Sequence, residues 1–223
     1  MQNKTGLYIV IEGQDGTGKS TQVEKCAEYF REQQRETIMI FREQQRETII
    51  INEGAEANSG LFSTDAIGKI LHTKDFGLEP ETNLALFTAQ RIELWRKKIL
   101  PTLAKNGIVI ASRNWWSTLA YQHFGEGIPR KLIEQITQDL MPKRYIFPDK
   151  SVMLILDDDE RKKRMKIRNQ NVEKDTFDSR AADFFGKVNN GYKQIAQDFR
   201  VPIINAKGTK EEVFDKIKKA LEV

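Results

Sequence analysis

Cysteine, histidine and long apolar runs are scarce in this chain of 223 residues, which has one cysteine and two histidines. Because Cys26 is alone, an internal disulfide is excluded, and no Cys/His pattern predicts a zinc site. The longest apolar runs, 7–11 and 152–156, are far shorter than the roughly 20 residues that cross a membrane. The first residues lack a signal-peptide pattern. We therefore expect a cytoplasmic protein without a membrane partner, with Cys26 packed in the core.

An excess of charge of one sign is also missing. The 36 lysines and arginines against 32 aspartates and glutamates give a net charge of +4. This excess is too small to indicate a nucleic-acid partner, and small phosphorylated ligands explain it equally well. The 39% hydrophobic content argues against disorder, and no glycine period or sustained heptad indicates collagen or a coiled coil. We expect a single domain over residues 1–223.

Short apolar runs alternate with longer amphipathic stretches, which predicts an α/β fold with a doubly wound, parallel, five-stranded sheet flanked by helices. The runs are nearly continuous in Ile, Val and Leu, as in strands that are buried on both faces. The expected strands are 7–12, one or both of 37–41 and 48–52, 108–112, 152–157 and 201–205. The expected helices are 19–34, 64–71, 81–103, 129–140, 159–168, 181–199 and 210–221.

A tandem duplication complicates the second strand, because residues 30–40 (FREQQRETIMI) and 41–51 (FREQQRETIII) differ only in Met39 against Ile50. Two copies do not make a repeat architecture, so we interpret one of them as an insertion, close to three helical turns long. If the second copy forms the strand, the first can prolong the preceding helix. If the first copy forms the strand, the second becomes a loop or an edge segment. The sequence leaves both arrangements open.

The sharpest motif is GQDGTGKST at residues 13–21, which fits G-x-x-x-x-G-K-[ST] between an expected strand and an expected helix. Its glycines let backbone N–H groups and the helix N-terminus face a polyphosphate, which Lys19 can also reach. The Ser20 hydroxyl can hold Mg²⁺. ATP and Mg²⁺ are therefore the expected cofactors. The expected ATP-binding residues are Gly13, Gln14, Asp15, Gly16, Thr17, Gly18, Lys19, Ser20 and Thr21.

The phosphate loop alone allows GTPases, ATPases and small-molecule kinases. A GTPase is disfavoured because no Asn-Lys-x-Asp element is present, Asn3-Lys4 being followed by Thr5-Gly6. The Asp15 carboxylate would be unfavourable beside a triphosphate unless it faced a sugar hydroxyl or a magnesium-bound water.

Three further segments extend the pattern. Residues 84–91 (LALFTAQR) place Phe87 and Arg91 on one helix face, where they can contact a base together or can be a core residue and a solvated charge. Residues 111–122 (ASRNWWSTLAYQ) follow a buried strand. Residues 156–168 (LDDDERKKRMKIR) carry arginines at helical spacing, which indicates a closing lid or a solvated basic face.

Through these four segments the chain resembles the bacterial-type thymidylate kinases, which have the P-loop nucleoside monophosphate kinase fold and transfer a phosphate from ATP to dTMP. The resemblance implies that Asp15 meets the sugar 3′-hydroxyl or the metal shell, and that a lid at about 159–178 closes over the reaction. It also implies a homodimer. The catalytic residues implied are Asp15, Lys19, Arg113, Arg161, Arg164 and Arg168, with Ser20 and Asp15 at the metal.

The resemblance also assigns the acceptor side. Phe87 would stack on the thymine ring and Arg91 would bond to it, while Arg113 would bind the acceptor phosphate. Tyr121 would lie under the deoxyribose and disfavour a 2′-hydroxyl. The implied substrate-binding residues are Glu53, Phe87, Arg91, Arg113, Ser117, Thr118, Tyr121 and Gln122.

This chain departs from the family at two places. Ser112 stands where the family has aspartate, which leaves the metal to Ser20, Asp15 and a lid carboxylate at position 175 or 178. The Arg-Glu-Pro-Gly-Gly segment is replaced by 41–44 or, in the better-placed register, by Asn52-Glu53. Two alternatives therefore stay open: a kinase for another deoxynucleotide or a deoxynucleoside, and a non-catalytic nucleotide-binding protein.

Overall fold

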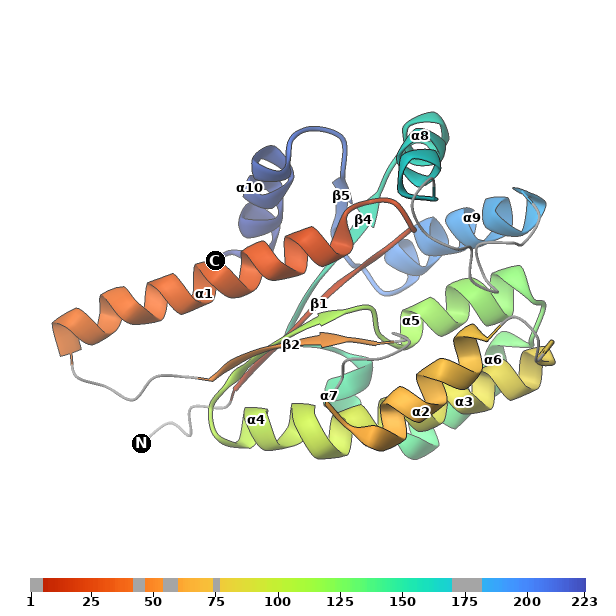
Figure 1. Ribbon diagram of the computed structural model, residues 1–223, viewed down its shortest axis with the longest axis horizontal. Coiled ribbons are helices and arrows are strands. Elements are labelled where there is room, and N and C mark those ends of the chain that lie inside the picture. Colours follow the sequence, from red (N-terminus) through yellow and green to blue (C-terminus); the bar gives the residue numbers. More distant parts are fainter. Residues whose placement is uncertain (1–5, 42–46, 54–59, 74–76, 170–181) are drawn as a thin grey trace.

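The computed structural model describes residues 6–41, 47–53, 60–73, 77–169 and 182–223 (Figure 1). Its strands form one parallel sheet in the order β2-β3-β1-β4-β5. They are β1 (Leu7–Gly13), β2 (Thr48–Asn52), β3 (Ile108–Ser112), β4 (Lys150–Ile155) and β5 (Ile203–Asn205). The predicted doubly wound, five-stranded parallel sheet is confirmed. Because all the strands run the same way, their carboxyl ends meet at one edge of the sheet.

Helices cover both faces of this sheet (Figure 1). One face is covered by α1 (Lys19–Phe41) and α10 (Lys210–Leu221). Most of the other helices pack on the opposite face: α3 (Pro80–Leu94), α5 (Trp115–Thr118), α6 (Arg130–Leu140), α7 (Lys143–Ile146) and α9 (Ala182–Asp198). α2 (Phe62–His72) packs on α3, and α8 (Asp158–Asn169) follows β4.

Successive residues of β1 supply the two cores, because side chains alternate across a strand. Ile9 and Ile11 pack with Cys26 of α1 and Ile217 of α10, while Val10 packs in the core of the other face. Burial raises the pKa of the Cys26 thiol to about 12, as expected for a core residue and not a reactive thiol. Among the described residues, no helix has both the length and the apolarity to span a membrane.

The duplicated segment adopts two different structures. The first copy continues α1 as far as Phe41, and the second copy supplies β2 at Thr48–Asn52. In Figure 1 the far end of α1 projects beyond the other elements. The side chains of 34–41 and all of 42–46 lie outside the described residues, so the expected apolar face of Ile38 and Phe41 is not described. Of the two arrangements that the sequence allows, the structure has the first.

Three helical regions differ from the prediction, and the shortest of them is α7, for which we predicted no helix. The helix expected over 81–103 is α3 followed by a π-helical segment, η2 (Trp95–Ile99), and by α4 (Leu100–Ala104). Residues 115–125, for which we predicted no helix, form α5 and a second π-helical segment, η3 (Leu119–Gly125). Residues 115–122 are all buried, so the apolar stripe that reveals a surface helix is missing there.

Candidate active site

The loop after β1 is fixed against the end of β4. Gly13 has a φ of 142°, and a Cβ there would lie 2.1 Å from the Leu154 carbonyl oxygen, so only glycine fits. The Gln14 side chain then accepts a hydrogen bond of 3.0 Å from the backbone N–H of Leu156. These contacts place the phosphate loop at the carboxyl edge, between the sheet and the N-terminus of α1.

The ends of the loop carry the groups that the motif predicts. Lys19 Nζ donates to the carbonyl oxygens of Gly13 at 2.9 Å and Gln14 at 2.8 Å, and lies 3.7 Å from Asp15 Oδ1. The Thr17 hydroxyl also donates to the Gln14 carbonyl at 2.8 Å. Ser20 is exposed in the first turn of α1, beside Lys19 and the half-buried Thr21. Amide groups, a cation and a hydroxyl therefore converge at one helix N-terminus, which suits a bound polyphosphate.

Arg113 follows β3 and reaches this loop. Its φ is 74°, a conformation that costs a non-glycine residue energy, and its backbone N–H donates to the Ile11 carbonyl at 3.2 Å. Its guanidinium forms an ion pair with Asp15, which also accepts a hydrogen bond from the Tyr121 hydroxyl. Burial, and then the Asp15 charge, raise the pKa of Tyr121 well above its ordinary value, so this hydroxyl stays protonated as a donor.

Two residues that sequence reasoning missed hold Arg113 and its neighbours: Tyr192, and Glu12, whose carboxylate lies 3.8 Å from the Arg113 guanidinium. Tyr192, from α9, contacts the Arg113 guanidinium at 2.8 Å and the Ser117 hydroxyl at 3.0 Å. The fully buried Glu12 carboxylate accepts from the Gly13 N–H at 3.0 Å, the Asn114 N–H at 2.9 Å and the Ser117 hydroxyl at 2.8 Å. An acid in the apolar run LYIVIEG was a signal for Glu12. Nothing local in the sequence pointed to Tyr192, which comes from a distant helix.

A second arginine site lies beside the first. Glu53 follows β2, and its backbone N–H donates to the Ser112 carbonyl at 3.1 Å. Its buried carboxylate accepts from Arg91 Nε at 3.1 Å and from the Tyr145 hydroxyl at 2.7 Å. Burial raises the pKa of Glu53 to about 7, while the Arg91 charge and the Tyr145 hydrogen bond oppose this rise. Because the Glu53 side chain is 0% exposed and bonds to Arg91, it can act on a ligand through Arg91.

The aromatic and polar residues predicted for a nucleoside lie around Arg91 and Tyr121. The guanidinium carbon of Arg91 lies 5.5 Å from the centre of the half-buried Phe87 ring, a cation–π distance. Thr118 and Gln122 are both buried on the helix that carries Tyr121. The Thr118 hydroxyl has no hydrogen-bond partner among the described residues, and the Gln122 amide donates to Glu126 at 3.2 Å.

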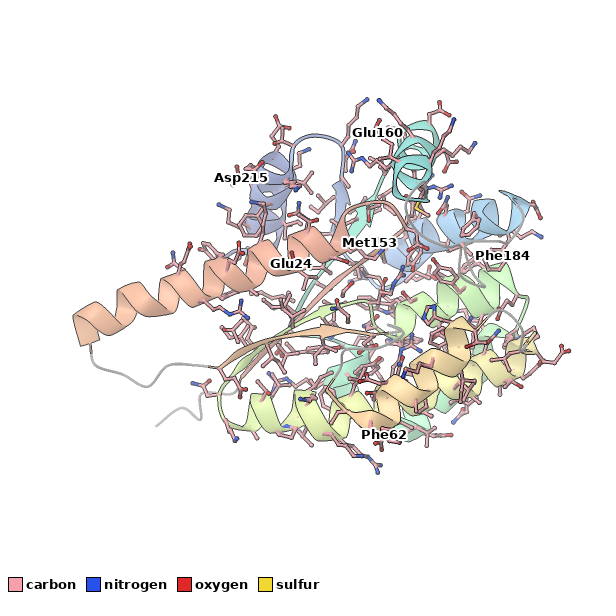
Figure 2. All side chains as sticks on the ribbon, in the orientation of Figure 1. Glu24, Phe62, Met153, Glu160, Phe184 and Asp215 are labelled. Atoms are coloured by element: carbon pink, nitrogen blue, oxygen red, sulfur yellow. The ribbon has the colours of Figure 1, made fainter. Side chains whose placement is uncertain are left out.

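The predicted lid begins as α8, which lies against the phosphate loop. A Cβ at Gly16 would lie 3.2 Å from the Cγ and Sδ atoms of Met165, so a long side chain would collide with α8 here. Arg161 is buried and its guanidinium carbon lies 6.0 Å from the Phe185 ring of α9, whereas Arg164 bonds to Glu160 at 3.0 Å. Figure 2 places Glu160 and Phe184 at the same end of the molecule.

The rest of the predicted lid is not described. The Arg168 side chain and all of 170–181, including the carboxylates at 175 and 178, lie outside the described residues. Segment 41–44, the other candidate for the Arg-Glu-Pro position, has only the backbone of Phe41 described. Ser112, which replaces the family aspartate, is buried at the end of β3.

Known proteins resemble this chain over nearly its whole length. A family model for thymidylate kinase matches residues 55–217. The thymidylate kinase of Carboxydothermus hydrogenoformans is 30% identical over 97% of both chains, and that of Chlorobium luteolum is 31% identical over 96% of both. The crystal structure of thymidylate kinase from Ehrlichia chaffeensis has a TM-score of 0.71 at 25% identity, covering 97% of this chain and 99% of that chain. On this sequence match and this shared arrangement, the chain belongs to the thymidylate kinase family.

Proposed function

We propose that this chain is a thymidylate kinase that transfers the γ-phosphoryl group of ATP to dTMP and releases ADP and dTDP. One observation carries the proposal: Lys19 of the phosphate loop and Arg113 of the β3 loop meet at the same Asp15 carboxylate. Lys19 belongs to the donor side, and Arg113 belongs to the acceptor side. Their proximity suits direct transfer, in which the reacting phosphates must lie next to one another.

Bond making and breaking in this reaction need no covalent enzyme intermediate. A 5′-phosphate oxygen of dTMP attacks the γ-phosphorus as the bond to the β,γ-bridging oxygen breaks, and the electron pair leaves with ADP. The N–H groups of the phosphate loop and Lys19 hold the donor phosphates, and Arg113 holds the acceptor phosphate. Arg161, Arg164 and Arg168 of the lid would offset the negative charge spread over the transferring group.

The donor set at the loop fits Mg²⁺, which prefers oxygen ligands and is usually bound by one or two protein groups together with substrate phosphates. The Ser20 hydroxyl is exposed beside Lys19, and the Asp15 carboxylate is 18% exposed. When bound, the ion neutralises charge on the phosphates. Asp15 keeps a further task, which is to orient Arg113 and Tyr121 through its two carboxylate oxygens.

The acceptor nucleoside would lie between the two arginine sites. Phe87 and Arg91 would contact the base, and Tyr121 would contact the deoxyribose. The other predicted substrate-binding residues of the helical segment that carries Tyr121 are Ser117, Thr118 and Gln122. Glu53 would act through Arg91. Apart from Glu53, which follows β2, these residues come from α3, α5 and η3, and these three elements contact one another. A homodimer in the cytoplasm is the assembly and location that we propose from the family resemblance.

The test is ADP release with Mg²⁺-ATP and a panel of acceptors: dTMP, dUMP, dCMP, dGMP, dAMP, UMP and thymidine. Lys19→Ala is the blank, because it removes the charge that reaches the terminal phosphates. Turnover selective for dTMP supports the proposal. Turnover on another acceptor would keep the phosphoryl transfer and overturn the substrate. ATP binding without turnover on any acceptor would contradict the enzyme assignment.

A further inference from the structure

A buried aromatic cluster lies behind Arg91. Tyr8 of β1, Trp95 of η2 and Tyr145 of α7 contact one another, with ring centres 5.7 to 6.3 Å apart. Their three side chains come from three elements of one core, and Tyr8 and Tyr145 are fully buried. The functional assignment above uses none of them.

One of these rings carries a polar contact toward the site. The Tyr145 hydroxyl donates to Glu53 Oε2 at 2.7 Å, and the same oxygen accepts from Arg91 Nε at 3.1 Å. Burial raises the pKa of Tyr145 well above its ordinary value, so the hydroxyl keeps the proton that it donates. Tyr145, Glu53 and Arg91 therefore form a chain of hydrogen bonds from the core to the predicted base site.

A shift of Tyr145 or Glu53 would change the orientation of the Arg91 guanidinium, because the three side chains are hydrogen-bonded in series. Among the described residues, the Arg91 side chain has one further hydrogen bond, from Nη2 to the Asn114 carbonyl oxygen at 3.3 Å, which is longer than an ideal charged hydrogen bond. The guanidinium fork is planar, so its use in recognising a base depends on its orientation. The Glu53 carboxylate can rotate if Tyr145 no longer fixes Oε2, because its other oxygen, Oε1, has no partner among the described residues.

We propose that Tyr145 is a positioning residue for Arg91, which it orients through Glu53, and that it thereby contributes to binding of a pyrimidine nucleotide acceptor. The inference deepens the proposed function and rests on it. Among the described residues, Tyr145 has no hydrogen bond or ring contact with the phosphate loop or with Arg113, so its effect should be confined to the acceptor base.

The cluster itself offers a matched control. The Tyr8 ring lies 6.3 Å from the Tyr145 ring at an interplanar angle of 19°, but the Tyr8 hydroxyl has no hydrogen-bond partner among the described residues. Tyr145→Phe and Tyr8→Phe each remove one buried hydroxyl from the same core. Only Tyr145→Phe removes a hydrogen bond to Glu53.

The experiment compares steady-state kinetics of the two variants with the wild type. We expect Tyr145→Phe to raise the KM for dTMP about tenfold, with kcat and the KM for ATP within roughly twofold, as loss of uniform acceptor binding requires. We expect Tyr8→Phe to leave all three constants within about twofold. Equal KM values for dTMP in the two variants would overturn the positioning role.

The pH profile supplies a readout that loss of packing alone would not move. The groups that face Glu53 are Arg91 of α3, Tyr145 of α7, and Glu12 and Tyr8 of β1. Removing the Tyr145 hydrogen bond should raise the pKa of Glu53 further, because that bond favours the carboxylate. The acid limb of kcat/KM for dTMP should therefore move to higher pH in Tyr145→Phe and stay in place in Tyr8→Phe.

The outcomes separate the inference from the proposed function. A wild-type enzyme without turnover on dTMP contradicts the proposed function, and the inference with it. Wild-type turnover on dTMP with an unshifted acid limb and an unchanged KM in Tyr145→Phe overturns the positioning role alone. Thermal unfolding of both variants is measured alongside, and equal unfolding temperatures together with unequal KM values for dTMP support the inference.

Discussion

The two arginine–carboxylate pairs of the site use the same chemistry at different depths. Arg113 and Asp15 are about one-fifth exposed, and both lie on loops at the carboxyl edge of the sheet. Arg91 and Glu53 are 6% and 0% exposed, and Glu53 is bonded again from the core by Tyr145. The first pair is open to a ligand, whereas the second is largely closed by protein.

Depth decides what each pair can do. An arginine at a partly open site can give its hydrogen bonds to a phosphate that competes with Asp15, because solvent and ligand reach both partners. A buried pair cannot exchange partners cheaply, because an unpaired charge left inside the protein is strongly unfavourable. We therefore interpret Asp15–Arg113 as the pair that can open to bind a phosphate, and Glu53–Arg91 as the pair that holds one arginine in place.

Removing Arg113 should have the largest effect on catalysis. We expect Arg113→Ala to lower kcat/KM for dTMP by about 10³-fold or more, because it removes the cation that we propose binds the acceptor phosphate. The same change should cost less stability than loss of a fully buried pair, roughly 1 to 2 kcal/mol, because Arg113 and Asp15 are about one-fifth exposed while the buried Glu12 carboxylate lies 3.8 Å from the guanidinium. Kinetics with varied dTMP and urea unfolding measure the two effects. A variant within about tenfold of wild type would contradict the proposal that Arg113 binds the acceptor phosphate.

Removing Arg91 should have the opposite pattern, with a larger effect on stability than removing Arg113. We expect Arg91→Ala to lower the free energy of unfolding by roughly 3 to 5 kcal/mol, because the Glu53 carboxylate loses its buried partner. Replacing both residues, as Arg91→Leu with Glu53→Leu, should recover most of that stability while dTMP binding stays weak. Urea unfolding and calorimetric titration with dTMP test this. If Arg91→Ala and Arg113→Ala lose equal stability, burial does not distinguish the pairs.

Stability at the buried pair should depend on pH. The pKa of Glu53 is raised from 4.5 to about 7, so between these values the folded protein holds more protons than the unfolded chain. This contribution is complete below about pH 4.5 and is lost as the pH rises through about 7, by at most ~3 kcal/mol. Wild type should therefore lose stability relative to Glu53→Gln over that interval. If the difference in free energy of unfolding between wild type and Glu53→Gln were the same at every pH, Glu53 would not be the source of the pH dependence.

The fold was predictable because most of its strands can be recognised from their sequence. A strand buried on both faces is nearly continuous in aliphatic residues, and four of the five expected strand positions needed no further information. The fifth was ambiguous because the sequence offers two copies of the same segment. The helix over 115–125 was missed because residues 115–122 are all buried, so no division into an exposed polar face and a buried apolar face marks it in the sequence.

The site was predictable only where it is contiguous in sequence. The phosphate loop, Phe87 with Arg91, and the segment around Arg113 are local motifs. The residues that orient them are not local: Tyr192 lies 79 positions from Arg113, and Tyr145 lies 92 positions from Glu53. Such partners follow from the order of strands and the packing of helices, which no spacing in the sequence encodes.

The duplication shows the same limit in one segment. Thr37-Ile38-Met39-Ile40 is helical in the first copy, and Thr48-Ile49-Ile50-Ile51 is a strand in the second. Local propensity cannot account for this difference, since the two runs differ in one residue. The second run pairs with β3, with Ile50 opposite Ile110, and the first continues a helix that has already begun. Context alone separates them.

Deleting residues 31–41 should have the smallest effect, because it leaves both ion pairs in place. The deletion joins Phe30 to Arg42, so an arginine again follows Phe30, and β2 keeps its whole sequence. The hydrogen bond from Arg31 to the Thr48 carbonyl, 3.2 Å long and exposed, is the described contact most directly lost. We expect kcat/KM for dTMP within about twofold of wild type and unfolding within roughly 1 kcal/mol.

Deletion of residues 42–52 instead tests whether the first copy of the duplicated segment can form β2. It keeps the first copy, so 37–41 would have to form β2 with Phe41 at the exposed position of Asn52, just before Glu53. If this protein also folds and phosphorylates dTMP, the duplicated segment takes its structure from its neighbours. The ion pair of Glu53 with Arg91 would then be retained, because Glu53 still follows the strand. A loss of folding confined to the 31–41 deletion would mean instead that the far half of α1 stabilises the sheet edge on which both arginine sites depend.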